Sequence, residues 1–203
     1  MSKRVYISAD YSISNGDRDI VDVLHSWWND NLHKVDYIDT AQVISGSVTS
    51  NPDCRACDLK AEFNAQINAS SAVIFIIGDK TSLRTAGSSC RRIHEGRYCS
   101  CTPYKQNANG SSICKISEPV FIAKINENLG VINTFSYLEH EFRQAEKKNK
   151  KITIVYNSLY NQYSWLPSYM RNYADIAVPF WINTPSSSRI GNYYFLKKAL
   201  GYD

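Results

Sequence analysis

The strongest constraint on the fold comes from residues 71–80, which read SAVIFIIGDK. This segment is an almost continuous apolar run, rich in β-branched residues, that leads into a glycine. A run of this length is typical of a central strand that is buried on both faces, as in a parallel sheet. The core is therefore expected to form around a sheet that is covered on both sides. Other strands are predicted at 4–8, 34–40, 120–124, 150–158 and 175–181.

Helical patterns alternate with these strands. The clearest helix is predicted after Gly16, where Asn15 or Asp17 can cap a segment whose apolar side chains recur at helical spacing. The residues on its apolar face are Ile20, Val23, Leu24, Trp27 and Trp28. Strands that alternate with helices indicate βαβ units, and hence a mainly parallel sheet with helices on both faces. Further helices are expected at 58–68, 135–148 and 186–200.

The 203 residues are predicted to form one α/β domain, residues 1–203, with an insertion at about 85–135. The insertion is rich in Ser, Gly, Asn, Cys and Arg and has little periodicity. In open parallel sheets, ligands bind beyond the carboxyl ends of the strands, where the strand order reverses. Loops 9–16, 39–57 and 79–84 are expected to meet at that edge, so the ligand site is predicted there.

The net charge of +4 is concentrated in one part of the chain. Residues 84–118 contain six Arg or Lys residues and two Glu residues, so the remainder is formally neutral. This distribution disfavours a uniformly basic surface for nucleic acid. No apolar run approaches the ~20 residues of a membrane span, and the first residues form a strand pattern rather than a signal peptide. We therefore expect a cytoplasmic protein that binds neither membrane nor nucleic acid.

Six cysteines raise the question of a metal site. Cys54 and Cys57 have the spacing of zinc ligands, whereas the other cysteines do not form a second pair of this kind. Free thiols are the simpler interpretation in a reducing compartment, and no catalytic metal is predicted. The alternative is a structural zinc held by Cys54 and Cys57 together with two of the remaining cysteines. Those are Cys90, Cys99, Cys101 and Cys114.

The predicted helix at 135–148 carries two glutamates with different surroundings. Phe135, Leu138, Phe142 and Ala145 form its apolar stripe, and His140 is predicted to point away from this stripe toward solvent.

Glu139 has Arg143 four residues later, so a surface ion pair explains it. Glu141 has no cation at the equivalent positions, and Tyr137 lies four residues before it. A carboxylate beside an aromatic ring at the rim of an α/β crevice suits the cleavage of ribosyl–nitrogen bonds, because it can stabilise a positively charged sugar. The alternative is an ordinary exposed helix glutamate.

Three ordered blocks of the sequence resemble bacterial TIR-like proteins of Thoeris-type antiphage defence. The blocks are KRVYISADY near the start, INASSAVIFIIGDKTS in the middle, and YLEHEFRQAEKKNKKITIVYN after the insertion. The resemblance covers about residues 3–84 and 136–158. It implies a flavodoxin-like, TIR-like three-layer fold with a central, mainly parallel five-stranded sheet and a Cys-rich insertion.

The resemblance also implies an activity. In that family a glutamate four residues after an aromatic residue cleaves NAD⁺ at the nicotinamide ribose, which gives ADP-ribose or a cyclic product. Carried over to this chain, the catalytic residue is Glu141. The residues placed around the substrate are Ser8, Ala9, Asp10, Tyr11, Asp39, Thr81 and Tyr137, the last in place of the family's usual tryptophan.

NAD⁺ would then be the substrate and no further cofactor is implied. The product would be a nucleotide signal read by a separate effector protein, and self-association is expected by the same resemblance. Two alternatives remain open. One is a non-catalytic TIR-like module that works by protein–protein assembly, and the other is an N-glycosidic enzyme that acts on other nucleosides or nucleotides.

Overall fold

The computed structural model of the chain describes residues 3–10, 17–31, 33–40, 62–83, 105–106, 112–113, 136–186 and 188–202. Its centre is a five-stranded sheet in which every neighbouring pair of strands is parallel. The strand order is β2-β1-β3-β6-β7. The predicted α/β class and the mainly parallel sheet are thus confirmed. The strands are β1 (Lys3–Ser8), β2 (Val35–Asp39), β3 (Ala72–Ile77), β6 (Lys151–Tyr156) and β7 (Val178–Pro179).

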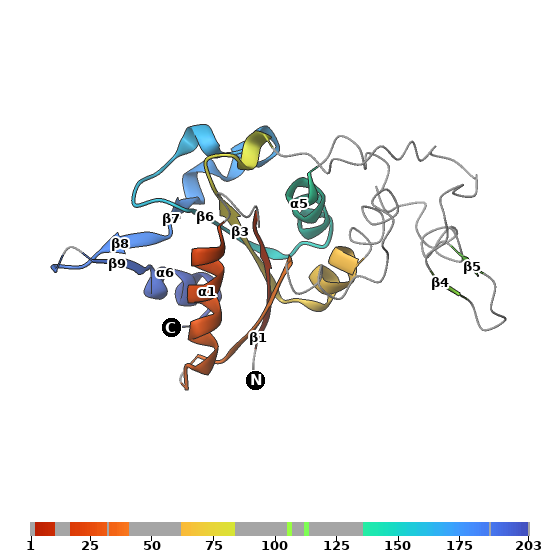
Figure 1. The fold of residues 1–203 in the computed structure, drawn as a ribbon, viewed down its shortest axis with the longest axis horizontal. Coiled ribbons are helices and arrows are strands. Elements are labelled where there is room, and N and C mark those ends of the chain that lie inside the picture. Colours follow the sequence, from red (N-terminus) through yellow and green to blue (C-terminus); the bar gives the residue numbers. More distant parts are fainter. Residues whose placement is uncertain are drawn as a thin grey trace.

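Helices cover both faces of this sheet (Figure 1). One face carries α1 (Arg18–Ser26) and α6 (Tyr193–Ala199), and the other carries α5 (Tyr137–Lys147) and a helix over residues 62–69. Strand β3 is buried along its whole length, and its side chains alternate between two hydrophobic clusters. The apolar run that constrains the fold most strongly therefore lies at the centre of three layers, as its composition predicts.

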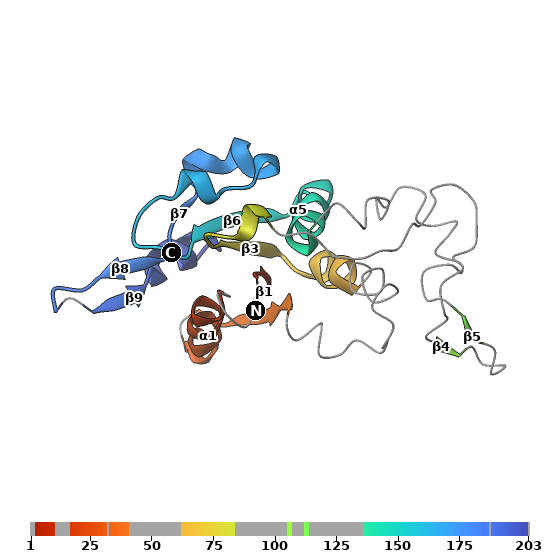
Figure 2. The same cartoon turned by 45° about the horizontal axis from the view of Figure 1, so that its top comes forward.

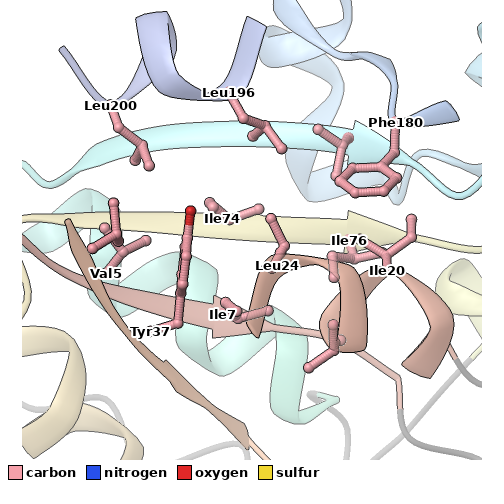
Figure 3. Packing of buried hydrophobic residues seen from close by; sticks show 14 of the residues in the cluster. Val5, Ile7, Ile20, Leu24, Tyr37, Ile74, Ile76, Phe180, Leu196 and Leu200 are labelled. Carbon is pink, nitrogen blue, oxygen red and sulfur yellow. The ribbon is translucent and has the colours of Figure 1, made fainter. Parts of the chain in front are cut away.

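The cluster beneath α1 and α6 is shown in Figure 3. Ile20 and Leu24 of α1 and Leu196 of α6 are fully buried against the sheet. Trp27 stacks on the buried Phe180 with a centroid distance of 5.8 Å, whereas Trp28 is 57% exposed, so its predicted place on the apolar face is wrong. The reason is that α1 ends at Ser26, and Trp28 lies in the 3₁₀ turn that follows, η1 (Trp27–Asn29), so the α-helical spacing that placed it on the apolar face does not extend to it.

The cluster on the opposite face is built around α5. Phe142 lies edge-on to Phe75 of β3 at a centroid distance of 5.5 Å. On one side α5 meets the helix over 62–69, whose Phe63 is fully buried. On the other side Phe142 contacts Tyr169 and Tyr173 of the long 3₁₀ segment η4 (Ser168–Ile176). Helix α5 is therefore enclosed by the sheet and by neighbours on both flanks.

Two of the predictions near the C-terminus are wrong in part. The strand expected at 175–181 shrinks to β7, because residues up to Ile176 belong to η4. The helix expected at 186–200 starts only at Tyr193, after Asn192 caps it by accepting a hydrogen bond from the Phe195 amide. The residues before it form an antiparallel hairpin, β8 (Trp181–Asn183) with β9 (Arg189–Gly191). This hairpin points away from the central sheet (Figure 2).

Several sequence predictions lie outside the described residues. They concern the strand at 120–124, residues 58–61 of a predicted helix, Tyr11, Asn15, all six cysteines and most of the insertion. Within the insertion the structure describes one short antiparallel pair, β4 (Lys105–Gln106) with β5 (Ser112–Ile113). Among the described residues, no helix is long and apolar enough to cross a membrane.

Candidate functional site

The candidate site centres on the Glu141 side chain, which is 1% exposed. It lies in the second turn of α5, a helix that begins where the Ser136 hydroxyl accepts a hydrogen bond from the Glu139 amide at 2.9 Å. The packing of Phe142 against β3 fixes the rotation of α5 about its axis and directs Glu141 toward the end of β1. The alternative of an ordinary exposed helix glutamate is therefore wrong.

Hydroxyl groups from the sheet donate hydrogen bonds to both oxygens of this carboxylate. The Tyr6 hydroxyl donates to Oε1 at 2.7 Å, and the Ser8 hydroxyl donates to Oε2. Tyr6 and Ser8 lie two residues apart on β1, so both side chains point to the face that α5 covers. Burying a carboxylate is costly unless its oxygens are hydrogen-bonded, and these donors offset that cost.

A third hydroxyl comes from the residue that follows β2. Thr40 Oγ1 lies 3.1 Å from the carbonyl oxygen of Ile7 and 3.4 Å from Glu141 Oε1. A hydroxyl has a single proton, so Thr40 can donate to only one of these acceptors at a time. The carboxylate thus sits where the carboxyl ends of β1 and β2 meet, and hydroxyls of Tyr6, Ser8 and Thr40 lie within hydrogen-bonding distance of it.

His140 is buried, contrary to the prediction, because a neighbouring helix covers its side of α5. This side chain is 5% exposed, although the apolar stripe alone predicts that it faces solvent. His140 lies on the same side of α5 as Tyr137 and Gln144. Tyr137 packs edge-on against Phe63 at 5.6 Å, and Gln144 donates a hydrogen bond to Asn68 at 2.8 Å. The helix over 62–69 therefore covers the side of α5 that the stripe leaves open.

The predicted ion pair on the other glutamate is confirmed. Arg143 Nη2 lies 2.7 Å from Glu139 Oε1, and Nε lies 3.0 Å from the same oxygen. The two neighbouring glutamates of α5 therefore differ in kind. Glu139 is partly exposed and pairs with the exposed Arg143, whereas Glu141 is buried against the sheet.

Two of the predicted substrate-lining residues, Ser8 and Tyr137, lie on the face that Glu141 occupies. Ala9 belongs to the cluster beneath α1, on the opposite face. Asp39 also points to that opposite face, where its Oδ2 lies 2.6 Å from His25 Nε2 of α1. Successive strand residues point to opposite faces, so Asp39 and Thr40 separate in this way.

The remaining predicted residues occupy the turns beyond the strands. Thr81 Oγ1 accepts a hydrogen bond from the Gly78 amide at 2.8 Å and so closes the turn after β3. The Asp10 carbonyl accepts a hydrogen bond from the Asp17 amide at 2.8 Å, which joins the two ends of the connection between β1 and α1.

Sequence reasoning missed Tyr6 and Thr40. A signal for Tyr6 was present, because Tyr6 and Ser8 alternate with the apolar Val5 and Ile7 in β1 and so place two hydroxyls on one face. Thr40 carried no such signal, because its role depends on where β2 lies in the sheet. A second buried carboxylate, Asp17, was predicted only as a helix cap, and its side chain makes no capping hydrogen bond.

In the part of the chain that the structure describes, no group of three or more His, Cys, Asp and Glu side chains is arranged to hold a metal ion. All six cysteines lie outside that part. The prediction of free thiols, and its alternative of a structural zinc, both stay predictions.

Comparison with known proteins gives no family for this chain. No protein-family model matches it, and no curated protein matches it.

Proposed function

We propose that this chain is a TIR-like enzyme that cleaves NAD⁺ at the bond between nicotinamide and ribose, with Glu141 as the catalytic carboxylate. The observation that carries the proposal is the burial of Glu141 at the carboxyl ends of β1 and β2, with the hydroxyls of Tyr6 and Ser8 donating to its two oxygens. That edge of a parallel sheet is where ligands of α/β proteins bind.

The chemistry requires a fixed negative charge beside a sugar ring. As the bond from the ribose C1′ to the nicotinamide nitrogen breaks, its electron pair leaves with nicotinamide and the ribose gains oxocarbenium character. A carboxylate held by protein hydroxyls can stabilise that positive charge without reorganising. Water then adds to C1′ and releases a proton, which gives ADP-ribose. In the cyclising variant, a nucleophilic group of the same dinucleotide attacks C1′ instead.

Access of the ribose to Glu141 has a simple requirement. A ribose hydroxyl has to replace one of the protein hydroxyls that now donate to the carboxylate. Of the two donors from β1, Ser8 is the one at the carboxyl end of the strand, where ligands bind. The replacement exchanges one hydroxyl donor for another, so the carboxylate keeps its number of hydrogen bonds. Thr40 can supply a donor during the exchange, because its proton is shared between two acceptors.

The topology supports the same proposal at the level of the fold. Counted within the central sheet alone, the strands follow the order 2-1-3-4-5 of flavodoxin-like doubly wound proteins. A TIR-like, flavodoxin-like fold accounts for this order and for helices on both faces. By the same resemblance, the nucleotide product would act as an antiviral signal on a separate effector, and the enzyme would self-associate.

The test is an analysis of substrates and products by mass-resolved chromatography. The purified full chain is incubated separately with NAD⁺, with nucleosides and with nucleotides, each with and without lysate from phage-infected bacteria. We expect nicotinamide release from NAD⁺, and the mass of the co-product distinguishes hydrolysis from cyclisation. Base release from the other compounds but not from NAD⁺ would replace this proposal with the general N-glycosidic enzyme. Turnover of none of them by a folded chain would favour the assembly module.

A further inference from the structure

A second carboxylate is buried on the other face of the sheet. Asp17, immediately before α1, is 2% exposed, and its Oδ1 accepts a hydrogen bond from Asn157 Nδ2 at 2.9 Å. Asn157 follows β6, and its own Oδ1 accepts a hydrogen bond from the Trp181 indole N–H at 2.7 Å. A chain of hydrogen bonds thus connects the start of α1 to the end of β6 and to the β8–β9 hairpin.

The end of β3 is shaped to receive this carboxyl group. A Cβ atom added at Gly78 would lie 2.7 Å from Asp17 Oδ1, which is closer than real Cβ contacts. Gly78 is therefore required by the close approach of Asp17 to the backbone. The carboxyl lies at the carboxyl ends of β3 and β6, while Asp10, just after β1, joins it through the backbone hydrogen bond from the Asp17 amide. Strand order reverses between β1 and β3, so this is the switch point of the sheet.

The charges around Asp17 disfavour its ionised form. Asp10 and Asp19 are its charged neighbours, and the nearby cation, Arg189 of β9, pairs with Asp19 at 3.2 Å. Oδ2 of Asp17 has no hydrogen-bond donor among the described residues. Burial, together with the two carboxylates, raises the pKa of Asp17 from 3.8 to about 7, although hydrogen bonding with the Asn157 side chain and the Asp10 backbone works in the opposite direction.

We propose that Asp17 is a positioning residue of the candidate site: its neutral side chain packs against Gly78 and Asn157, and its backbone amide thereby fixes Asp10, just after β1. The inference rests on the proposed function only in taking Ser8 as part of that site. Ser8 donates to Glu141, and Asp10, two residues later, is bonded to the Asp17 amide. The position of Asp17 therefore bears on the segment that carries the hydroxyl donor of Glu141.

Ionisation of Asp17 weakens this arrangement. A negative charge on Oδ2 would be buried without a donor and beside two other carboxylates, so the side chain has to move toward water or admit water. Either change separates Asp17 from Gly78 and shifts Asp10 with it. Ala9 and Asp10 consequently take one position when Asp17 is neutral and another when it is ionised.

The test is a pH titration of the ¹⁵N-labelled full chain by NMR, from about pH 5 to about pH 9 to span the titration. The chain has four tryptophans, and Trp181→Phe identifies the indole N–H signal of Trp181. We expect this signal and the backbone amide signals of Ser8 and Asp10 to shift with one common midpoint near 7. In Asp17→Asn, which resembles the neutral acid in shape, all three shifts should be lost.

Asp19→Asn is the matched control, because it removes a neighbouring negative charge and keeps Asp17. The common titration should persist there with a lower midpoint. If Asp17→Asn does not fold, ¹³C labelling of the aspartate carboxyl groups in the wild type reports the Asp17 titration directly.

Two results would overturn the proposal. One is the absence of any aspartate that titrates near neutral pH. The other is a titration that moves the Trp181 signal but leaves Ser8 and Asp10 unmoved, because Asp17 would then be a buried structural acid without influence on the site. Neither readout depends on NAD⁺ cleavage, so failure here is distinct from failure of the proposed function.

Discussion

Glu141 and Asp17 are buried on opposite faces of the central sheet, and the two carboxylates are compensated differently. Glu141 receives hydrogen bonds from hydroxyls on both oxygens. Asp17 receives a bond from Asn157 on Oδ1, and Oδ2 has no donor among the described residues. The first arrangement can stabilise a charge, and the second favours a proton. Two acids at the same edge of one sheet are therefore suited to different tasks, one to electrostatic catalysis and the other to a protonation-dependent contact.

The largest expected effect concerns the pH dependence of stability. The pKa of Asp17 is raised in the folded state from 3.8 to about 7, so its contribution to stability is full below about pH 4 and is lost as the pH rises to about 7. A shift of this size corresponds to about 4 kcal/mol of unfolding free energy. We expect Asp17→Asn to lack this loss and to be more stable than the wild type above pH 7. Urea unfolding at a series of pH values measures the difference, and parallel curves for the two proteins would contradict it.

The close approach of Asp17 to the backbone can be tested by filling the space. Gly78→Ala places a Cβ only 2.7 Å from Asp17 Oδ1, so we expect a loss of about 2 kcal/mol of unfolding free energy. Asp17→Ser shortens the side chain that the new Cβ would meet. In the Asp17→Ser background, Gly78→Ala should therefore cost much less unfolding free energy than it does in the wild type. A double-mutant cycle of thermal or urea unfolding gives the coupling. If the effects of the two substitutions on the unfolding free energy are strictly additive, the Cβ at position 78 does not contact the Asp17 side chain.

On the other face, the hydrogen bond from Tyr6 to Glu141 can be tested by removing its hydroxyl and comparing the effect with removal of another buried tyrosine hydroxyl. Tyr6→Phe removes the donor to Oε1, and we expect a loss of about 1.5 kcal/mol, as is usual for a hydrogen bond to a charged group. Tyr156→Phe is the control, because Tyr156 is equally buried in the same cluster and its hydroxyl has no partner among the described residues. That change should be neutral or slightly stabilising. Equal losses in the two variants would remove the special role of Tyr6.

The smallest effect is expected at the neighbouring glutamate. Glu139→Gln breaks an ion pair with Arg143, which is 47% exposed, so the unfolding free energy should change by no more than about 0.5 kcal/mol. Thermal unfolding of both proteins at low and at high salt measures this change. The difference between them should be smaller at high salt, because salt already weakens the ion pair in the wild type. A loss of several kcal/mol would mean that Glu139 belongs to the buried network.

The sequence predicts the sheet better than it predicts the site. Strand β3 was evident because it is apolar throughout, and α1 because its buried side chains recur at helical spacing. The hairpin β8–β9 was missed, since its strands have three residues each and Ile182 and Ile190 are exposed on both of them. Such short, partly exposed strands have no periodicity that a sequence can display.

Within the site, Glu141 could be singled out because no Lys or Arg follows it by three or four residues in the sequence. The hydroxyls of Tyr6 and Thr40 come from β1 and from the end of β2, far away in the sequence, so only the strand order brings them to Glu141. The same reason applies to His140, which is covered on the side of α5 that faces a second helix. Side-chain alternation sends Asp39 and Thr40 to opposite faces, but which of them faces Glu141 depends on how β2 is placed on β1, which the sequence does not specify.

The central claim, that Glu141 performs the cleavage, is tested most directly by nicotinamide release from NAD⁺ in three matched proteins. These are the wild type, Glu141→Gln and Glu139→Gln, each shown to be folded and assayed at equal concentration. We expect the Gln substitution at 141 to lower the rate by at least about 100-fold, as for the loss of one group that stabilises transition-state charge. The substitution at 139 should leave the rate within about 2-fold, consistent with a surface pair. Equal release by all three proteins, or no release by the folded wild type, would contradict the claim.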